Sequence, residues 1–85
     1  MRYVYLIRSI PNAAEYYVGV TGSVKDRLRQ HNEGNSPHTA KFRPWRLVVV
    51  VGFTDEQAAN RFEKYLKSGS GREFARRHFR PPSPR

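Results

Sequence analysis

The sequence predicts an α+β fold class: a small three-stranded antiparallel sheet flanked by helices, in the order β-β-α-β-α-α. Three observations lead to it. Two short runs rich in aromatic and β-branched residues, 3–8 and 15–20, are separated by a turn. A third apolar run covers residues 45–53. The segments after the second and third runs have apolar residues at helical spacing, behind residues that cap helices.

The chain has 85 residues and is predicted to form one domain over residues 1–79. A chain of this size buries only about 60% of its unfolded surface, which leaves room for one core. Hydrophobic residues make up 38% and aromatic residues 13%, which favours a globular chain over a disordered one. The Pro-rich tail, residues 80–85, cannot continue a helix and is predicted to be disordered.

Charge is the strongest global feature of the chain. Sixteen Lys and Arg stand against seven Asp and Glu, for a net charge of +9, and twelve of the sixteen cations are arginine. The planar fork of arginine pairs with phosphate through two parallel hydrogen bonds. The expected partner is therefore polyanionic, with nucleic acid first. A membrane surface fits poorly, because no segment is both strongly amphipathic and basic along one face.

The cysteine content and the N-terminal segment indicate in which cellular compartment the protein is expected. The chain has no cysteine, which excludes disulfides and thiolate metal sites. The first twelve residues carry an apolar run that is too short to span a membrane and lacks the cleavage pattern of a signal peptide. We therefore expect a cytoplasmic protein.

The first two strands are predicted at residues 3–8 and 15–20, around a turn at Pro11 and Asn12. They are close in sequence, so an antiparallel hairpin is the simplest pairing. Both alternate sets of side chains in the first strand are largely apolar, which predicts an interior strand or one covered on both faces. Gly19 weakens the second strand unless another group must approach its backbone closely.

The first helix is predicted to begin after Ser23, a favourable N-cap, and to end near Gly34. Residues 35–44 are predicted to be a loop, because they are rich in turn residues and cations. The third strand, residues 45–53, contains four consecutive valines, which predicts burial on both faces.

Two further helices follow the third strand. Thr54 is predicted to open the second helix as the first residue of a TDEQ capping box. Gly69 and Gly71 are predicted to end that helix. A third, shorter helix is predicted from Ser70 to about Phe79.

Five polar side chains on these elements could form one site. Tyr5 and Tyr17 lie in the middle of neighbouring strands, and their hydroxyls share a face if the hairpin is in register. Arg27 and His31 are one helical turn apart and share a face. Glu63 is a carboxylate beside an apolar stripe in an otherwise basic chain. Such groups suit phosphate-ester chemistry, where positioning and electrostatics carry most of the catalysis.

The segments that hold these residues resemble the GIY-YIG nuclease superfamily. They are YVYLIR, YYVGV, RLRQHN, RPWRLV and FEKYLK, and the likeness runs from about Tyr3 to Lys67. Their order and spacing together carry the resemblance. Within the superfamily the chain resembles the small single-domain bacterial members and the nuclease domain of structure-selective flap endonucleases.

The resemblance implies a role for each of the five residues. Tyr5 stands at the tyrosine of the first motif, as base or water-orienting group, and Tyr17 of the second motif is its partner. Arg27 stands at the catalytic arginine and would clamp a phosphoryl oxygen, while His31 would relay a proton. Glu63 stands at the carboxylate that ligates one divalent cation, Mg²⁺ or Mn²⁺. A nearby arginine and metal would lower the tyrosine pKa.

The implied function is a metal-dependent endonuclease that hydrolyses DNA phosphodiester bonds and is structure-selective in repair or recombination, with RNA as a further substrate to test. Five more cations are predicted to contact the nucleic-acid backbone: Arg29, Lys41, Arg43, Arg46 and Lys67. A second hypothesis is a nucleic-acid-binding module of the same fold that cleaves weakly or not at all. A third is a domain of a larger assembly in which a partner protein supplies specificity.

Departures from the family pattern keep the second hypothesis open. Ala75 stands where many members have an asparagine, and Val20 and Thr21 follow the second motif where some members have a lysine two residues on. Ordinary structural roles also account for single residues: tyrosines fill half-buried strands, and Glu63 has Lys67 four positions on as an ion-pair partner. Convergence of all five residues in space is what separates the functional interpretation from the structural one.

Overall fold

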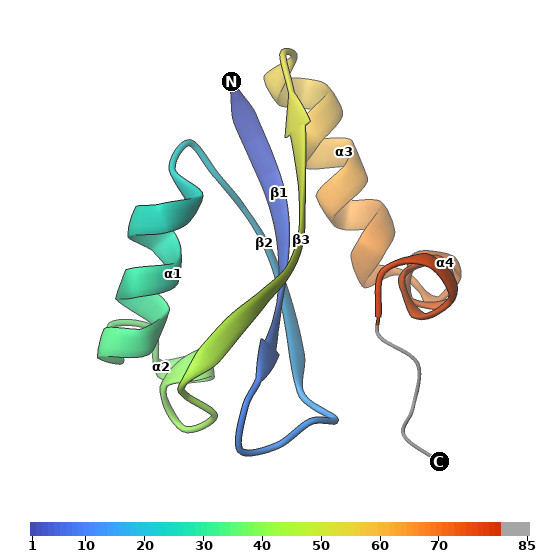
Figure 1. The fold of residues 1–85 in the computed structure, drawn as a ribbon. Coiled ribbons are helices and arrows are strands. Elements are labelled where there is room, and N and C mark those ends of the chain that lie inside the picture. Colours follow the sequence, from blue (N-terminus) through green and yellow to red (C-terminus); the bar gives the residue numbers. More distant parts are fainter. Residues whose placement is uncertain (81–85) are drawn as a thin grey trace.

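A computed structural model describes residues 1–80, in which a three-stranded antiparallel sheet carries helices on both faces (Figure 1). The elements are β1 (Arg2–Ser9), β2 (Tyr16–Thr21), α1 (Val24–Glu33), α2 (Pro37–Ala40), β3 (Trp45–Phe53), α3 (Glu56–Lys67) and α4 (Gly69–His78). The predicted fold class and order are confirmed, with a one-turn helix, α2, inside the predicted loop. Of the predicted tail, residues 81–85 lie outside the described residues.

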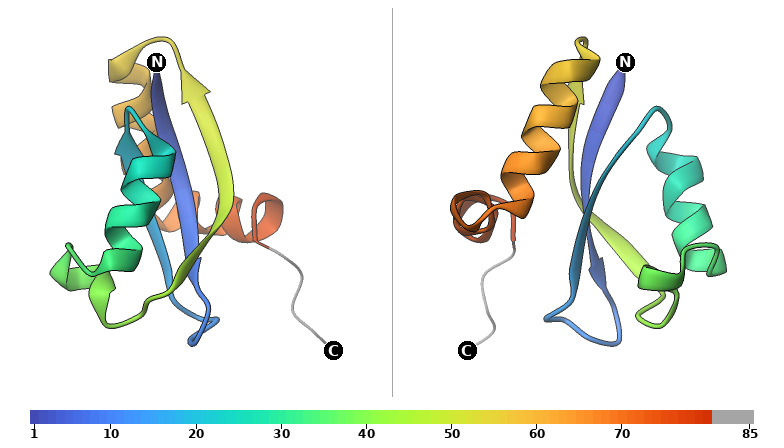
Figure 2. Two further views of the ribbon diagram at one scale, coloured as in Figure 1. Left: turned by 60° about the vertical axis from the view of Figure 1, so that its left-hand side comes forward. Right: turned by 180° about the vertical axis from the view of Figure 1, so that it is seen from behind.

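Strand β1 is the middle strand and pairs antiparallel with both neighbours. Helix α1 lies on one face of the sheet and α3 on the other (Figure 2). Burial of β1 is therefore nearly complete: Val4, Tyr5, Leu6 and Ile7 are each at most 2% exposed. The prediction of an interior first strand is confirmed.

Strand β3 is an edge strand, so the prediction of burial on both faces was wrong. Its valines, residues 48–51, are only half-buried, and Leu47 is 39% exposed. The pairing with β1 is also irregular, because Leu6 faces Val49 whereas Ile7 faces Leu47. The valine run reflects the preference of β-branched residues for a pleated, half-buried surface rather than an interior position.

Two apolar cores lie on opposite faces of the sheet. One joins Val4 to α3 and α4, through Ala59, Leu66 and Ala75. The other lies between the sheet and α1 and is built on Tyr5, Ile7 and Trp45, with Tyr17, Val24, Leu28, Phe42 and Val50 packed against it. This second core holds the aromatic rings in place, so packing and the candidate site share side chains.

The ends of α1 are as predicted. The Ser23 hydroxyl oxygen accepts the Asp26 N–H at 3.4 Å, and Gly34 closes the helix in the left-handed conformation with φ of 83°. Helix α3 begins one residue later than predicted, because its N-cap is Asp55 rather than Thr54. None of the helices within residues 1–80 is long and apolar enough to cross a membrane.

The corner between α3 and α4 differs from the prediction. Gly69 and Gly71 lie inside α4 instead of ending α3, and the N-cap of α4 is Ser68 rather than Ser70. Helix α4 packs so tightly on the end of α3 that a Cβ at Gly71 would overlap the carbonyl oxygen of Tyr65. Gly71 therefore permits a close approach of two helices, which the spacing of glycines along the chain does not distinguish from a helix stop.

Candidate active site

The hairpin of β1 and β2 brings two phenols to one face, as predicted. Tyr5 pairs with Gly19 and Ile7 pairs with Tyr17, so the two tyrosines are diagonal neighbours, with ring centroids 6.4 Å apart. A Cβ at Gly19 would overlap the Tyr5 hydroxyl and lie 2.5 Å from its Cζ. The group that approaches the backbone at Gly19 is therefore the Tyr5 ring.

His31, in the last turn of α1, is 1% exposed and lies against both phenols. Its Nε2 is 2.9 Å from the Tyr5 hydroxyl, and its ring centroid is 5.1 Å from that of Tyr17. On the other side, Nδ1 is 2.8 Å from Thr39 Oγ1, which donates to the Ser36 carbonyl at 3.4 Å. Thr39 thus accepts the Nδ1–H, and Nε2 is left to accept the Tyr5 hydroxyl hydrogen.

Thr39 was missed in the sequence. It is 1% exposed, and its backbone carbonyl accepts the Trp45 indole N–H at 2.8 Å, which anchors α2 against the start of β3. Its separation of eight residues from His31 matches no helix or strand period across a predicted loop. Only the tertiary packing of α2 brings its hydroxyl to the imidazole.

Burial sets the protonation of the central pair. It raises the pKa of the Tyr5 hydroxyl above its ordinary value of 10.0, and the Arg27 guanidinium opposes that rise. The expected lowering by arginine is thus present but outweighed. Burial, with Arg27 beside it, lowers the pKa of His31 below 6.5. At neutral pH the pair is a neutral phenol and a neutral imidazole, which a proton transfer from Tyr5 to Nε2 requires.

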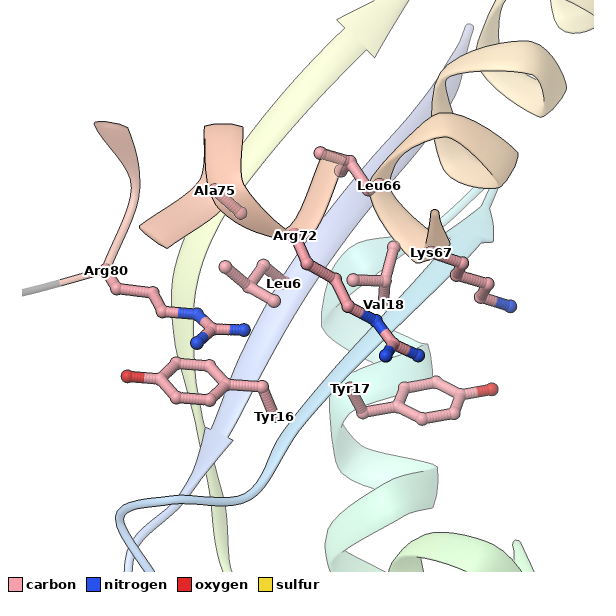
Figure 3. A pocket seen from close by; sticks show the side chains of 9 residues that line it. All are labelled: Leu6, Tyr16, Tyr17, Val18, Leu66, Lys67, Arg72, Ala75 and Arg80. Atoms are coloured by element: carbon pink, nitrogen blue, oxygen red, sulfur yellow. The ribbon is translucent and has the colours of Figure 1, made fainter. Parts of the chain in front are cut away.

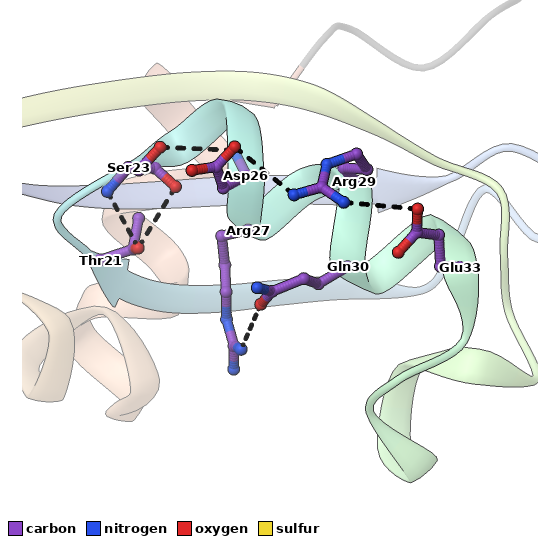
Figure 4. Close-up of polar contacts among 7 residues, drawn as sticks. All are labelled: Thr21, Ser23, Asp26, Arg27, Arg29, Gln30 and Glu33. Atoms are coloured by element: carbon purple, nitrogen blue, oxygen red, sulfur yellow. Dashed lines mark hydrogen bonds and ion pairs between the residues drawn. The ribbon is translucent and has the colours of Figure 1, made fainter.

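Arg27 projects from α1 away from the row formed by Asp26, Arg29 and Glu33 (Figure 4). Its Nη1 donates to the Gln30 side-chain oxygen at 3.1 Å. No carboxylate within residues 1–80 lies at ion-pair distance from Arg27. Its charge is therefore available to an anion.

Glu63 reaches the site from α3. Its side chain is 20% exposed, and Oε2 accepts from Lys67 Nζ at 3.0 Å, as the structural interpretation expected. Lys67 Nζ in turn lies 6.0 Å from the centroid of the Tyr17 ring. The Glu63 charge adds a last, smallest contribution to the raised pKa of Tyr5, so the carboxylate lies within electrostatic range of that hydroxyl. Tyr5, Tyr17 and His31 are thus in contact, with Arg27 beside Tyr5, whereas Glu63 is linked to them only through Lys67. The catalytic roles of all five residues stay predictions.

A divalent cation at this site would depend on Glu63. Within the described part of the chain, no three His, Cys, Asp or Glu side chains come together, so these residues offer no all-protein cage. Mg²⁺ is commonly held by one or two carboxylates, several waters and substrate phosphate. A partly exposed carboxylate fits that mode, and Glu63 would exchange its ion pair with Lys67 for the cation.

The five cations predicted to contact nucleic acid do not all gather here. Lys67 lies beside Tyr17, but Arg29 is paired with two carboxylates of its own helix. Lys41 lies over the ring of its neighbour, and the Arg43 guanidinium packs against the end of α1. Arg46 lines a separate cavity of about 190 Å³. Of these, Lys67 alone adjoins the candidate site.

We expect the free energy of unfolding to fall as pH drops below 6.5. The folded state holds His31 neutral with a lowered pKa, so the unfolded chain binds more protons in that range. The contribution of His31 to the free energy of unfolding is fully present above pH 6.5 and is lost as the pH falls toward the pKa of the folded state. The free energy changes by no more than about 1.4 kcal/mol per pH unit. Urea unfolding at several pH values measures it. His31→Gln should weaken the dependence of the free energy of unfolding on pH. The control His38→Gln, at an exposed position, should keep that dependence. Equal curves for the wild type and His31→Gln would contradict the role of His31.

Together, fold and site define a small α+β domain in which a buried phenol–imidazole pair has a guanidinium beside it and a carboxylate within electrostatic range. The chain belongs to the GIY-YIG family, a family of nucleases, because the GIY-YIG catalytic domain matches residues 1–77. Its relatives include the structure-specific endonuclease subunit SLX1 of Debaryomyces hansenii, 39% identical over 71 residues, which are 75% of this chain and 20% of that protein. The SLX1 of Candida dubliniensis is 44% identical over 71 residues, covering 75% and 25%.

The chain spans a quarter or less of the length of these two relatives. A solved structure of similar fold is the solution NMR structure of the UPF0213 protein BH0048 from Bacillus halodurans. It matches with a TM-score of 0.54 and 29% identity over 89% of this chain and 81% of that one. The predicted family membership is confirmed.

Proposed function

We propose that this domain is a divalent-metal-dependent endonuclease that hydrolyses DNA phosphodiester bonds in branched or flapped structures of repair or recombination. The observation that carries the proposal is the 2.9 Å contact between the Tyr5 hydroxyl and His31, with the Arg27 guanidinium beside Tyr5 and Glu63 within electrostatic range. The net charge of +9 supports a polyanionic substrate. The relatives named as subunits of structure-specific endonucleases support both structure selectivity and a partner protein that supplies part of it.

In the proposed mechanism Tyr5 handles the proton of the attacking water. The water gives a proton to the Tyr5 oxygen while Tyr5 passes its own hydroxyl hydrogen to His31 Nε2, across the 2.9 Å contact. The oxygen left by the water then forms the bond to phosphorus as the bond to the leaving oxygen breaks. Thr39 keeps Nε2 free for this transfer by accepting the Nδ1–H. Tyr17 holds the imidazole from the other side.

Arg27 and Glu63 would stabilise the negative charge that builds on the phosphate in different ways, Arg27 directly and Glu63 through a bound cation. Arg27 has no carboxylate partner within residues 1–80, so its guanidinium can donate to a phosphoryl oxygen. Glu63 would hold a divalent cation, whose chemistry when bound is to polarise the phosphate and stabilise the leaving oxygen. Lys67, once released from Glu63, remains close enough to attract the same polyanion.

The second candidate function, a nucleic-acid-binding module that cleaves weakly, is favoured by one residue. Ala75 stands where many family members have an asparagine, and it is 3% exposed on the buried face of α4. An alanine offers the site no polar group at that position. The two candidates differ in cleavage and not in binding, so a cleavage assay decides between them.

Arg27→Ala is expected to slow cleavage of flapped, branched or nicked DNA by about 10²–10³-fold, because the developing phosphoryl charge loses a preorganised donor. Rates are measured with Mg²⁺ and with Mn²⁺, and an RNA substrate is run in parallel. The matched control is Arg61→Ala, an exposed arginine of α3. Wild-type protein that binds each substrate without cutting it would support the binding module. Undiminished cleavage by Arg27→Ala would contradict the role of Arg27.

A further inference from the structure

A cavity of about 270 Å³ adjoins the active site on the far side of Tyr17, between β2 and the corner of α3 and α4 (Figure 3). Tyr17 and Lys67 belong to its wall as well as to the candidate active site. The cavity and the candidate active site therefore share two side chains, so a strand that leaves the active site along β2 would meet the cavity next.

The charged residues that line the cavity are all cations: Lys67, Arg72 and Arg80. Among the described residues, Arg72 and Arg80 have no carboxylate at ion-pair distance. The Nε of Arg80 is buried and has no hydrogen-bond partner in residues 1–80. A buried N–H without an acceptor costs free energy, and an anion in the cavity would satisfy it.

Aromatic rings alternate with these cations. The Arg80 guanidinium lies over the Tyr16 ring, with its Cζ 4.2 Å from the centroid. Arg72 extends from α4 toward Tyr17 on the same side (Figure 3). Cations that hold the backbone, next to aromatic side chains that hold bases or sugars, are the composition of sites for single-stranded nucleic acid.

We propose that this cavity binds one nucleotide of an unpaired strand next to the scissile bond, with its phosphate held by Arg72 and Arg80. The volume corresponds to about nine water molecules, which admits a sugar–phosphate with part of a base and excludes a duplex. The mechanism proposed above gives no role to Tyr16 or to these two arginines. The inference rests on the proposed function only in taking the bound strand to be the substrate of cleavage. Binding itself can be measured without cleavage.

The test measures binding of a short fluorescent oligothymidylate in EDTA, as a function of salt. The double variant Arg72→Gln/Arg80→Gln removes the proposed contacts. The control Arg61→Gln/Arg76→Gln removes the same charge from outside the cavity, where Arg76 is paired with Glu73 at 2.6 Å. The first variant should bind about ten-fold more weakly per lost contact. Its log–log salt slope should be shallower by about 0.7, because the two arginines hold one phosphate of a single strand.

Equal weakening in both double variants would overturn the inference, because charge alone would then explain binding. An equal loss on a blunt duplex would overturn the preference for an unpaired strand. If the double variant is destabilised because Arg80 also supports folding, the single variant Arg72→Gln tests the site instead, because Arg72 is exposed. Wild-type protein that binds through the cavity but never cleaves would refute the nuclease and leave this site standing. Cleavage by the wild type, together with unchanged oligothymidylate binding by the double variant, would refute this site and leave the nuclease standing.

Discussion

Replacing Glu63 with glutamine is expected to abolish cleavage while the fold and nucleic-acid binding persist. Glutamine keeps the shape of the side chain but removes the charge that would hold a cation beside the phenols. Loss of metal stabilisation worth several kcal/mol lowers the rate by about 10³-fold or more. Folding should change little, since an i,i+4 pair such as Glu63–Lys67 on a helix contributes about 0.3–0.5 kcal/mol.

Cleavage rates on flapped DNA across a Mn²⁺ titration, with thermal unfolding beside them, measure this effect. The matched control is Glu56→Gln in the first turn of the same helix, where the side chain is 68% exposed. Glu63→Gln should lose both the rate and its dependence on metal, and the control should keep both. Cleavage at the wild-type rate by Glu63→Gln would rule out its role as metal ligand.

Gly19→Ala is expected to disrupt stability and cleavage together. The new methyl group would overlap the Tyr5 hydroxyl, and Tyr5 is 2% exposed on the central strand, so the ring has little room to move. Overpacking of this kind costs about 1–3 kcal/mol. Any shift that relieves the overlap also lengthens the 2.9 Å contact from Tyr5 to His31, through which the proposed proton transfer runs. Cleavage should therefore fall even under conditions where the variant is fully folded.

Urea unfolding and cleavage rates below the unfolding transition separate the two effects. Gly52→Ala is the control on β3, because the nearest atom to its new methyl group is the Met1 sulfur at 3.1 Å, on an exposed terminal side chain that can move. A Gly19→Ala variant with unchanged stability and rate would show that the Tyr5 ring is free to move. The position of the phenol would then not limit the reaction.

The parts of the site set by local geometry could be predicted from the sequence. Alternation along two strands joined by a short turn brings Tyr5 and Tyr17 to one face. A spacing of four residues brings Arg27 and His31 to one side of a helix. The need for a close approach at Gly19 was also apparent, although its partner was not.

The remainder depends on contacts between segments that are distant in the sequence. Thr39 reaches His31 only because Trp45 holds α2 in place. Glu63 was placed with the tyrosines through a family resemblance, since no periodicity relates α3 to the hairpin. The edge position of β3 depends on which strand takes the centre, and a valine run is compatible with either position.

The central position of β1 determines how the candidate site loses its structure when the protein is heated. The strand is hydrogen-bonded along both sides and covered on both faces, so its amides open only when the whole domain unfolds. Tyr5 is carried by that strand. The phenol therefore has no separate, lower-temperature melting step of its own, and its surroundings persist until the domain loses its structure as one cooperative unit.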